Sequence, residues 1–294
     1  MNYSFEKIRL QVENYSRKGN KESIIDLLTN YLQSDLEVEE RVWGWWNLVD
    51  NLAMLRRCSD AVAQQENYLK WAVSSNLASQ LILEVMNDGT QALCWLQLNR
   101  LDDWISIFNQ LIDNTKPSQE DRLARFYYFR TAAGIFSTAT RYELAEDAII
   151  KLKNLLLEDI NWEQKTWVEI EIAAVELNLL EAKSDINQAL QVTAKVKAQI
   201  DTIERLQLAK PTKISTLWHN NAAPLFRMGL YLEAELMFRR AIASNPQNWY
   251  SLVFLAGCLT KLANHPQESD QLLAKAVSLT NQRDYEALLS HVYP

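Results

Sequence analysis

Apolar residues recur every three or four positions along most of this chain, which is the period of an amphipathic α-helix. Phe5, Ile8 and Val12 begin the pattern, and Gly19 is placed to stop the first helix. The same alternation of a periodic stretch and a short polar break continues as far as Val292. We therefore expect an all-α protein of about seven antiparallel helical pairs.

The polar breaks between these stretches mark the expected turns and joints. They fall at 56–60, 99–100, 117–118, 158–161, 210–212 and 264–266. Two long helices are expected at about 161–182 and 185–208. Lys210-Pro211-Thr212 is the clearest linker-like joint, because proline biases the residue before it away from helix. We expect 1–208 to form divergent N-terminal repeats and 212–294 to form C-terminal repeats with a terminal helix, in one continuous solenoid.

One stretch, from Trp218 to Pro246, has a distinctive spacing of small, aromatic and turn residues. These residues are Trp218, Ala222, Gly229, Tyr231, Ala234, Phe238, Ala241 and Pro246. The pattern resembles the tetratricopeptide repeat (TPR), a helix–turn–helix unit of 34 residues. Ala222 and Ala234 are small where the two helices approach closely, and Gly229 suits a left-handed helix end. Pro224 lies inside the first helix, where we expect it to produce a kink.

A single unit of this kind cannot bury its own apolar face, so the resemblance implies further units. Two other helical pairs carry parts of the pattern: Trp45, Leu48, Leu52 and Ala61 in the second, and Phe129, Ala133, Phe136, Tyr142 and Ala145 in the fourth. The resemblance thus implies an α-α superhelix, a TPR-like solenoid, whose first helices line a concave groove.

In that family, repeat positions two, five, nine, twelve and thirteen commonly point into the groove. Carried over to this chain, they give the candidate binding residues Trp43, Trp46, Asp50, Tyr127, Arg130, Ser137, His219, Phe226 and Arg227. The family's clamp for chaperone C-termini uses Lys and Asn at fixed groove positions. Position five here is Trp46, Arg130 and His219 in turn, so we do not expect that ligand class.

Three indoles fall within four residues, at Trp43, Trp45 and Trp46. Trp45 fits the repeat core. Trp43 and Trp46 lie three apart and share a helix face. They are either exposed anchors for a partner or part of the packing between neighbouring helices.

Charge and cysteine content narrow the class of protein. The net charge of −7 disfavours non-specific binding to nucleic acid or to anionic membranes. The N-terminus has no signal-peptide pattern, and no apolar run reaches the roughly 18 residues of a membrane helix.

Cys94 and Cys258 lie in apolar contexts, so we expect them to be small core residues, whereas Cys58 is in a polar stretch where exposure is expected. Three free thiols would fit a reducing compartment, so we expect a cytoplasmic protein.

The sequence offers little that indicates catalysis. It has no phosphate-binding or dinucleotide-binding glycine loop, no nucleophile elbow and no H-E-x-x-H motif. The histidines His219, His265 and His291 lack a second His or Cys at helical spacing, so we expect no metal site. The stretch 161–208 contains neither His nor Cys, which leaves little for a hidden active site. We expect no cofactor and no enzymatic activity.

The resemblance favours a scaffold or adaptor that binds a protein or peptide segment in its groove. The alternative is a peptide-responsive regulator, similar to bacterial TPR quorum-sensing regulators but without a DNA-binding domain of its own. The near-neutral first 33 residues count against direct DNA binding. Self-association is compatible with the apolar content but is not required by it.

Overall fold

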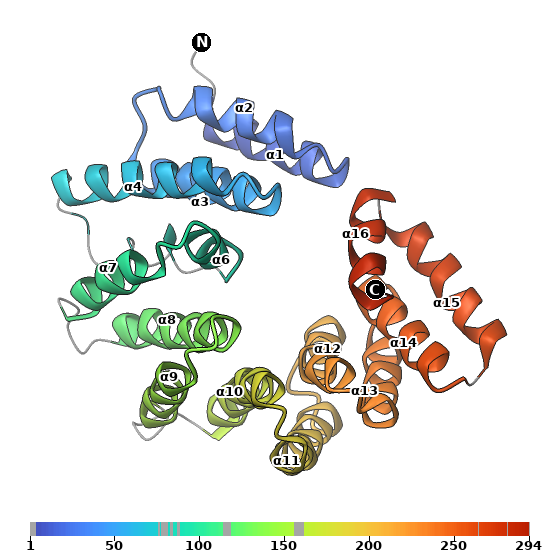
Figure 1. Cartoon of the computed structure of the whole chain (residues 1–294). Coiled ribbons are helices and arrows are strands. Elements are labelled where there is room, and N and C mark those ends of the chain that lie inside the picture. The colour runs from blue at the N-terminus through green and yellow to red at the C-terminus, as the bar shows by residue number, and fades with distance from the viewer. Residues whose placement is uncertain are drawn as a thin grey trace. The chain divides into compact units, whose positions relative to one another are not determined.

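The computed structural model describes residues 4–75, 77, 82, 85–86, 89–113, 119–155, 162–263, 265–280 and 282–293. Throughout these residues the regular structure is α-helical, which confirms the expected all-α helical-repeat fold (Figure 1). The chain forms two compact units, Met1–Ala139 and Thr140–Pro294. The joint expected at Lys210-Pro211 lies inside the second unit, where Pro211 is the first residue of a helix. The predicted breaks at 117–118, 158–161 and Asn264 lie outside the described residues.

Unit 1 contains the helices α1 (Phe5–Arg17), α2 (Lys21–Tyr31), α3 (Val38–Met54), α4 (Cys58–Ser74), α6 (Gly89–Gln97), α7 (Leu101–Asp113) and α8 (Gln119–Thr138). Unit 2 contains α9 (Tyr142–Leu155), α10 (Trp162–Lys183), α11 (Ile186–Arg205), α12 (Pro211–Arg227), α13 (Tyr231–Ser244), α14 (Trp249–Lys261), α15 (Pro266–Leu279) and α16 (Gln282–Val292). Many helices pack on a neighbour in the sequence, as in α3 with α4 and α12 with α13, and others contact the helix two places away, as in α6 with α8 and α10 with α12.

Every first helix ends on a residue in the left-handed conformation. These residues are Gly19, Arg56, Asn99, Thr140, Ser184, Gly229 and Ala263. At most of these turns a backbone N–H reaches back to a carbonyl of the last helical turn, as from Arg57 to Leu52 (3.0 Å) and from Leu230 to Leu225 (2.9 Å). This is the Schellman arrangement, which satisfies carbonyls that the helix leaves unpaired. Only two of the seven residues are glycine, so a search for glycine finds few of these turns.

The core of unit 2 is centred on the close contact between α12 and α13. Ala222 and Ala234 are fully buried there, and the large rings of Trp218 and Phe238 surround them. The small side chains allow the two helix backbones to approach, and the rings then fill the space beside them. α12 continues through Pro224 as one helix from Pro211 to Arg227.

Unit 1 uses a buried polar network between α4 and α6. Trp95 Nε1 donates to Gln65 Oε1 (2.6 Å), and Gln65 Nε2 donates to Gln91 Oε1 (2.7 Å). All three residues are fully buried. Gln65 departs from the repeat pattern because it pairs polar groups that would otherwise be unsatisfied in the core.

The cysteines of unit 1 correct a prediction. Cys58 is buried rather than exposed, and it forms a disulfide with Cys94, with the two Cα atoms 4.7 Å apart. The bond joins the start of α4 to the middle of α6. Cys258 is a buried free thiol, as expected. The expectation of three free thiols is therefore wrong, because the fold brings together two cysteines that are distant in sequence.

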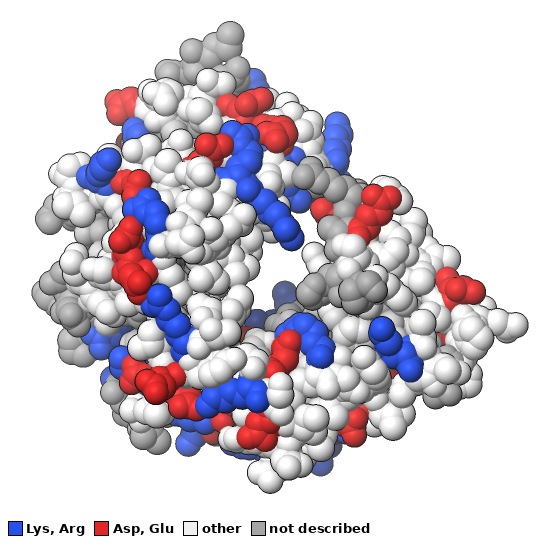
Figure 2. Space-filling model, in the orientation of Figure 1, with Lys and Arg blue, Asp and Glu red and all other residues white. Residues whose placement is uncertain are grey.

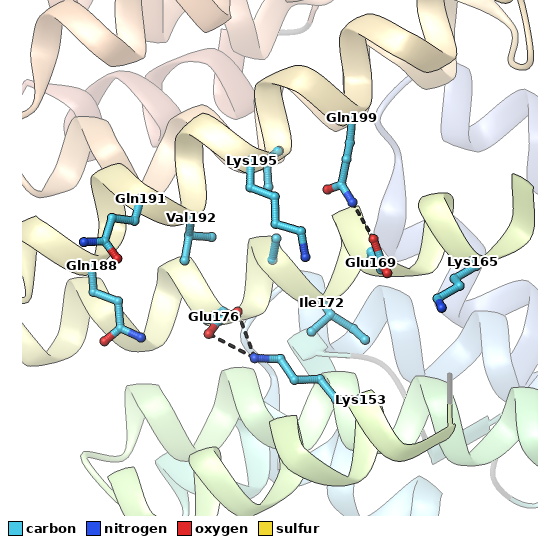
Figure 3. A pocket seen from close by; sticks show the side chains of 12 residues that line it. Lys153, Lys165, Glu169, Ile172, Glu176, Gln188, Gln191, Val192, Lys195 and Gln199 are labelled. Atoms are coloured by element: carbon cyan, nitrogen blue, oxygen red, sulfur yellow. Dashed lines mark hydrogen bonds and ion pairs between the residues drawn. The ribbon is translucent and has the colours of Figure 1, made fainter. Parts of the chain in front are cut away.

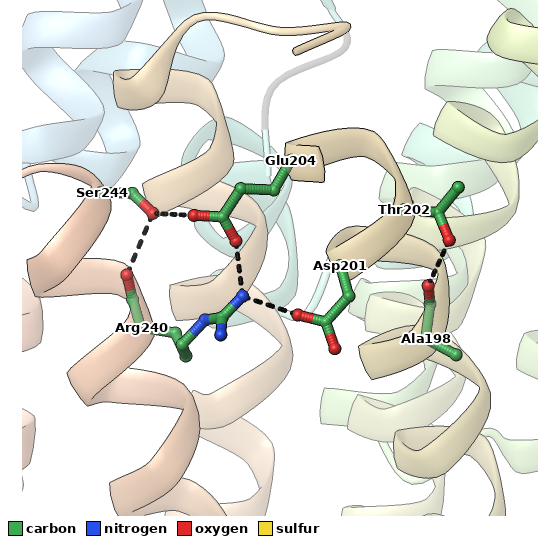
Figure 4. A network of polar contacts seen from close by, with 6 residues as sticks. All are labelled: Ala198, Asp201, Thr202, Glu204, Arg240 and Ser244. Carbon is green, nitrogen blue, oxygen red and sulfur yellow. Dashed lines mark hydrogen bonds and ion pairs between the residues drawn. The ribbon is translucent and has the colours of Figure 1, made fainter. Parts of the chain in front are cut away.

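The second helices of unit 2 are linked on their outer side by charged side chains. Arg240 on α13 donates to Asp201 (2.6 Å) and Glu204 (2.7 Å), which both lie on α11 (Figure 4). Ser244 also contacts the Glu204 carboxylate (3.3 Å). Each partner is partly exposed, so the network orients α11 against α13 more than it stabilises the fold.

Candidate interaction surfaces

The first helices of unit 1 present large apolar side chains to solvent. α3 contacts α6, and α6 contacts α8, so these three helices lie side by side. Trp46 and Met54 on α3 are 42% and 52% exposed, Leu93 on α6 is 44% exposed, and Tyr127 on α8 is 45% exposed. We call these four residues the unit 1 apolar face. Monomeric proteins seldom leave large apolar groups clustered in solvent without a binding function.

The other residues predicted for unit 1 divide between the rim of this face and the interior. Arg130 places its guanidinium 5.9 Å from the Tyr127 ring centroid. Asp50 is half-buried. Trp43 packs edge-on against Phe5 at 5.2 Å, so it belongs to the packing of α1 on α3. Ser137 is buried and its hydroxyl donates to the Ala133 carbonyl (2.7 Å), so it does not line an accessible surface.

In unit 2 the predicted first-helix residues are held by contacts within the protein. Arg227 on α12 makes a two-pronged ion pair with Glu181 (2.6 and 2.7 Å) and donates to Asn178 (3.0 Å), both on α10. Phe226 is buried against Phe254 (5.2 Å between centroids). The expectation that Phe226 lines an accessible groove is therefore wrong.

Phe226 is buried because the terminal helix α16 reaches this face. A Cβ built on Gly257 of α14 would lie 2.6 Å from Val292 Cγ1 and 3.1 Å from the Phe226 ring. Val292 is fully buried, and Tyr293 directs its hydroxyl to Thr260 (3.4 Å). α16 thus covers the C-terminal part of the first-helix face in unit 2.

His219 is fixed between α12 and α14. Its Nδ1 lies 2.9 Å from the Ser251 hydroxyl, and its ring packs 5.5 Å from both Phe238 and Phe254. Burial, with a smaller contribution from the Arg227 charge, lowers the pKa of His219 from 6.5 to about 4. The imidazole is therefore neutral at pH 7 and serves as a packing group that satisfies a buried hydroxyl.

A separate cleft of about 490 Å³ lies in unit 2 between α9 and α11, with α10 as its floor (Figure 3). Sequence reasoning missed it, since its lining residues carry no motif. They are Lys153, Lys165, Glu169, Ile172, Ala173, Glu176, Gln188, Gln191, Val192, Lys195, Val196 and Gln199.

Opposite charges are interspersed over the face drawn in Figure 2. Ion pairs such as Arg100–Glu66 (2.7 Å) and Arg57–Glu22 (3.0 Å) are examples of such paired charges in unit 1.

Within the described residues no group of three His, Cys, Asp or Glu side chains could hold a metal ion, and the His291 side chain is outside that description. None of the described helices is long and apolar enough to cross a membrane.

Comparison with known proteins identifies the architecture. No protein-family model matches the chain, and no curated protein matches it. A crystal structure of a tetratricopeptide repeat protein from Parabacteroides merdae is similar over 99% of both chains, with a TM-score of 0.50 and 13% identity. This chain has a TPR-like fold.

Two further solved structures are less similar. The TPR2AB domain of yeast Sti1 in complex with an Hsp90 peptide has a TM-score of 0.33 and 12% identity, over 99% of this chain and 98% of that one. The APC/C hetero-tetramer Cut9–Hcn1 has a TM-score of 0.45 and 12% identity, over 99% and 50%.

The TPR register explains which face the exposed residues occupy. When the left-handed turn residue of each pair is aligned with Gly229, Trp46 falls at position five and Met54 at position thirteen of the second unit. Leu93 falls at position nine of the third unit, and Tyr127 at position two of the fourth. All four are groove positions in TPR proteins. The groove residues predicted from the sequence did not include Met54 or Leu93. Alignment of the third helical pair on its turn residue Asn99 would have identified Leu93.

Proposed function

We propose that this TPR-like protein is a scaffold that binds a peptide segment of a partner protein on the unit 1 apolar face. The observation that carries the proposal is the exposure of Trp46, Met54, Leu93 and Tyr127 on three neighbouring first helices. Aromatic residues dominate the binding energy of protein interfaces, because they bury a large area at a small cost in side-chain entropy.

The surroundings of the apolar face suit a peptide ligand. Trp46 has no ring contact with another described aromatic residue and is 42% exposed, so part of its indole is accessible to a partner. Arg130 and Asp50 supply charges of both signs at the rim, which favours orientation of a ligand more than raw affinity. A partner helix or extended strand with apolar side chains at regular spacing would fit such a row of anchors.

The test is affinity capture from extract of the native cells with the wild type and a Trp46→Ala/Tyr127→Ala variant. The control is Leu232→Ala/Leu236→Ala on α13 of unit 2, where the side chains are 59% and 56% exposed. Circular dichroism first confirms equal helicity. We expect a partner that the wild type and the control retain and that the aromatic variant loses by at least about tenfold, the effect of hot-spot removal.

Equal retention by all three proteins would show that the partner binds elsewhere, and loss from the control alone would move the site to unit 2. Trp43→Ala is unsuitable as a binding variant, because Trp43 packs against Phe5 and its removal loosens α1.

A further inference from the structure

The cleft of unit 2 has a distinct order of chemistry along its length (Figure 3). Gln188 and Gln191 line one end. Val192 and Ile172 form an apolar centre, and the buried Val196 also lines the cleft. Lys165 lies at the opposite end, and the charged side chains of Lys195, Glu176 and Lys153 lie around the centre.

The charges inside the cleft are only partly neutralised by each other. Lys153 on α9 pairs with both oxygens of Glu176 on α10 (3.1 and 3.2 Å). Glu169 accepts a hydrogen bond from Gln199 on α11. Lys165 and Lys195 make no ion pair or side-chain hydrogen bond with any described residue. Two cations are therefore available to a ligand, on a chain whose net charge is −7.

Helix register gives the spacing of the two free cations. The Gln199–Glu169 hydrogen bond places those residues level with each other on the antiparallel helices α11 and α10. Lys195 lies one helical turn to one side of that level and Lys165 one turn to the other. At a rise of 1.5 Å per residue, the two attachment points are about 12 Å apart along the cleft.

This spacing argues against a compact anion as the ligand. A phosphate group spans far less than about 12 Å, and Glu169 and Glu176 would repel a concentrated negative charge. Two carboxylates on an extended chain divide the negative charge between the two lysines, so that Glu169, which lies level with the midpoint, does not face a concentrated charge. Residues four apart in an extended peptide are about 13 Å apart, which matches the lysine spacing.

We propose that this cleft binds an extended acidic peptide segment with two carboxylate side chains four residues apart and an apolar side chain between them. The carboxylates pair with Lys165 and Lys195. The apolar side chain rests on Ile172, which Figure 3 shows between the two ammonium groups. Val192 and the amides of Gln188 and Gln191 lie beyond Lys195, where they can contact a continuation of the peptide. The site is on the second-helix side of unit 2 and is independent of the unit 1 apolar face.

The probe is an array of acetylated, amidated pentapeptides of pattern Glu-x-apolar-x-Glu, with Gln-x-apolar-x-Gln as the neutral counterparts. The tightest acidic peptide is then titrated by fluorescence anisotropy against the full-length protein. We expect Lys165→Gln/Lys195→Gln to weaken binding about tenfold, since each exposed ion pair contributes modestly. Lys151→Gln is the matched control, because Lys151 is an α9 lysine paired with Asp147 (2.7 Å) outside the cleft.

Charge reversal provides the positive test. Lys165→Glu/Lys195→Glu should lose the acidic peptide and bind its Lys-x-apolar-x-Lys counterpart. The proposal is overturned if no peptide in the array binds in a charge-dependent way, or if both lysine variants bind like the wild type. It is also overturned if inorganic phosphate, at a concentration that carries the same total charge as the peptide, displaces the peptide. Trp46→Ala/Tyr127→Ala should leave this titration unchanged, so the outcome does not depend on the proposed function of unit 1.

Discussion

Replacing Gly257 with alanine measures how closely the terminal helix α16 packs against α14. The added methyl group would lie 2.6 Å from Val292 Cγ1 and 3.1 Å from two carbons of the Phe226 ring. Valine is short and stiff at χ1, so its methyl group cannot rotate away freely. Either α16 shifts outward or the Phe226 ring is displaced.

The clash sets the magnitude. Overpacking of this kind costs about 1–3 kcal/mol. The higher helix propensity of alanine stabilises α14 whether or not α16 is docked, so it cancels from the docking equilibrium. Because α16 is terminal and can shift outward, we expect Gly257→Ala to destabilise its docking by about 1 kcal/mol. In a Val292→Ala background the closest clash is absent, so the same change should be more favourable by about 1–2 kcal/mol.

Hydrogen-exchange mass spectrometry of the segment that contains α16 is the assay, because it reports local opening rather than unfolding of the whole repeat array. In the wild-type background Gly257→Ala should lower protection about fivefold, which corresponds to about 1 kcal/mol. In the Val292→Ala background it should leave protection unchanged or raise it.

An equal effect of Gly257→Ala in both backgrounds would contradict a close contact between Val292 and Gly257. It would mean that Val292 does not lie against Gly257, and that Phe226 is buried by something other than α16. Increased protection of α16 in both backgrounds would also contradict the close contact, since the added methyl group would then stabilise the docking of α16.

Three further predictions concern stability. Reduction of the Cys58–Cys94 disulfide should destabilise unit 1 by up to about 4 kcal/mol, because the bond closes a long loop in the unfolded chain. Proteolytic digestion without reduction should yield the two cysteine peptides cross-linked to each other. Recovery of both cysteines in alkylated form without any reductant would contradict the disulfide. The lowered pKa of His219 means that the unfolded state binds its proton first, so stability should fall as the pH drops from about 6.5 to 4, by up to about 3 kcal/mol. Urea unfolding at pH 7 and 4.5 measures this loss, and His219→Gln should reduce it; an unchanged pH dependence in that variant would assign the loss to other groups. Arg240→Gln should cost about 1 kcal/mol or less, and 0.5 M salt should shrink the difference, whereas a cost of several kcal/mol would show that the α11–α13 network is a main source of stability.

The sequence was sufficient for the helices and for their pairing. Apolar periodicity is a local property, and it placed α10 and α11 within a few residues of their observed bounds. The spacing from Trp218 to Ala234 was sufficient for the TPR-like packing of α12 on α13, because close helix approach needs small residues at that contact. The turns between the two helices of each pair were harder to locate, since Arg56, Asn99, Thr140, Ser184 and Ala263 adopt a conformation that is typical of glycine.

The accessibility of each residue depends on tertiary contacts that a local sequence pattern does not contain. A helix in a stacked array contacts neighbours on several sides, so periodicity alone cannot separate an exposed groove position from a buried one. Trp43 packs against Phe5, and Phe226 is buried near Gly257, where Val292 of the terminal helix also packs. Trp46 has no comparable neighbour among the described residues and stays 42% exposed. The Cys58–Cys94 bond and the lysine cleft arise in the same way, because both depend on which helices pack together and not on any local spacing.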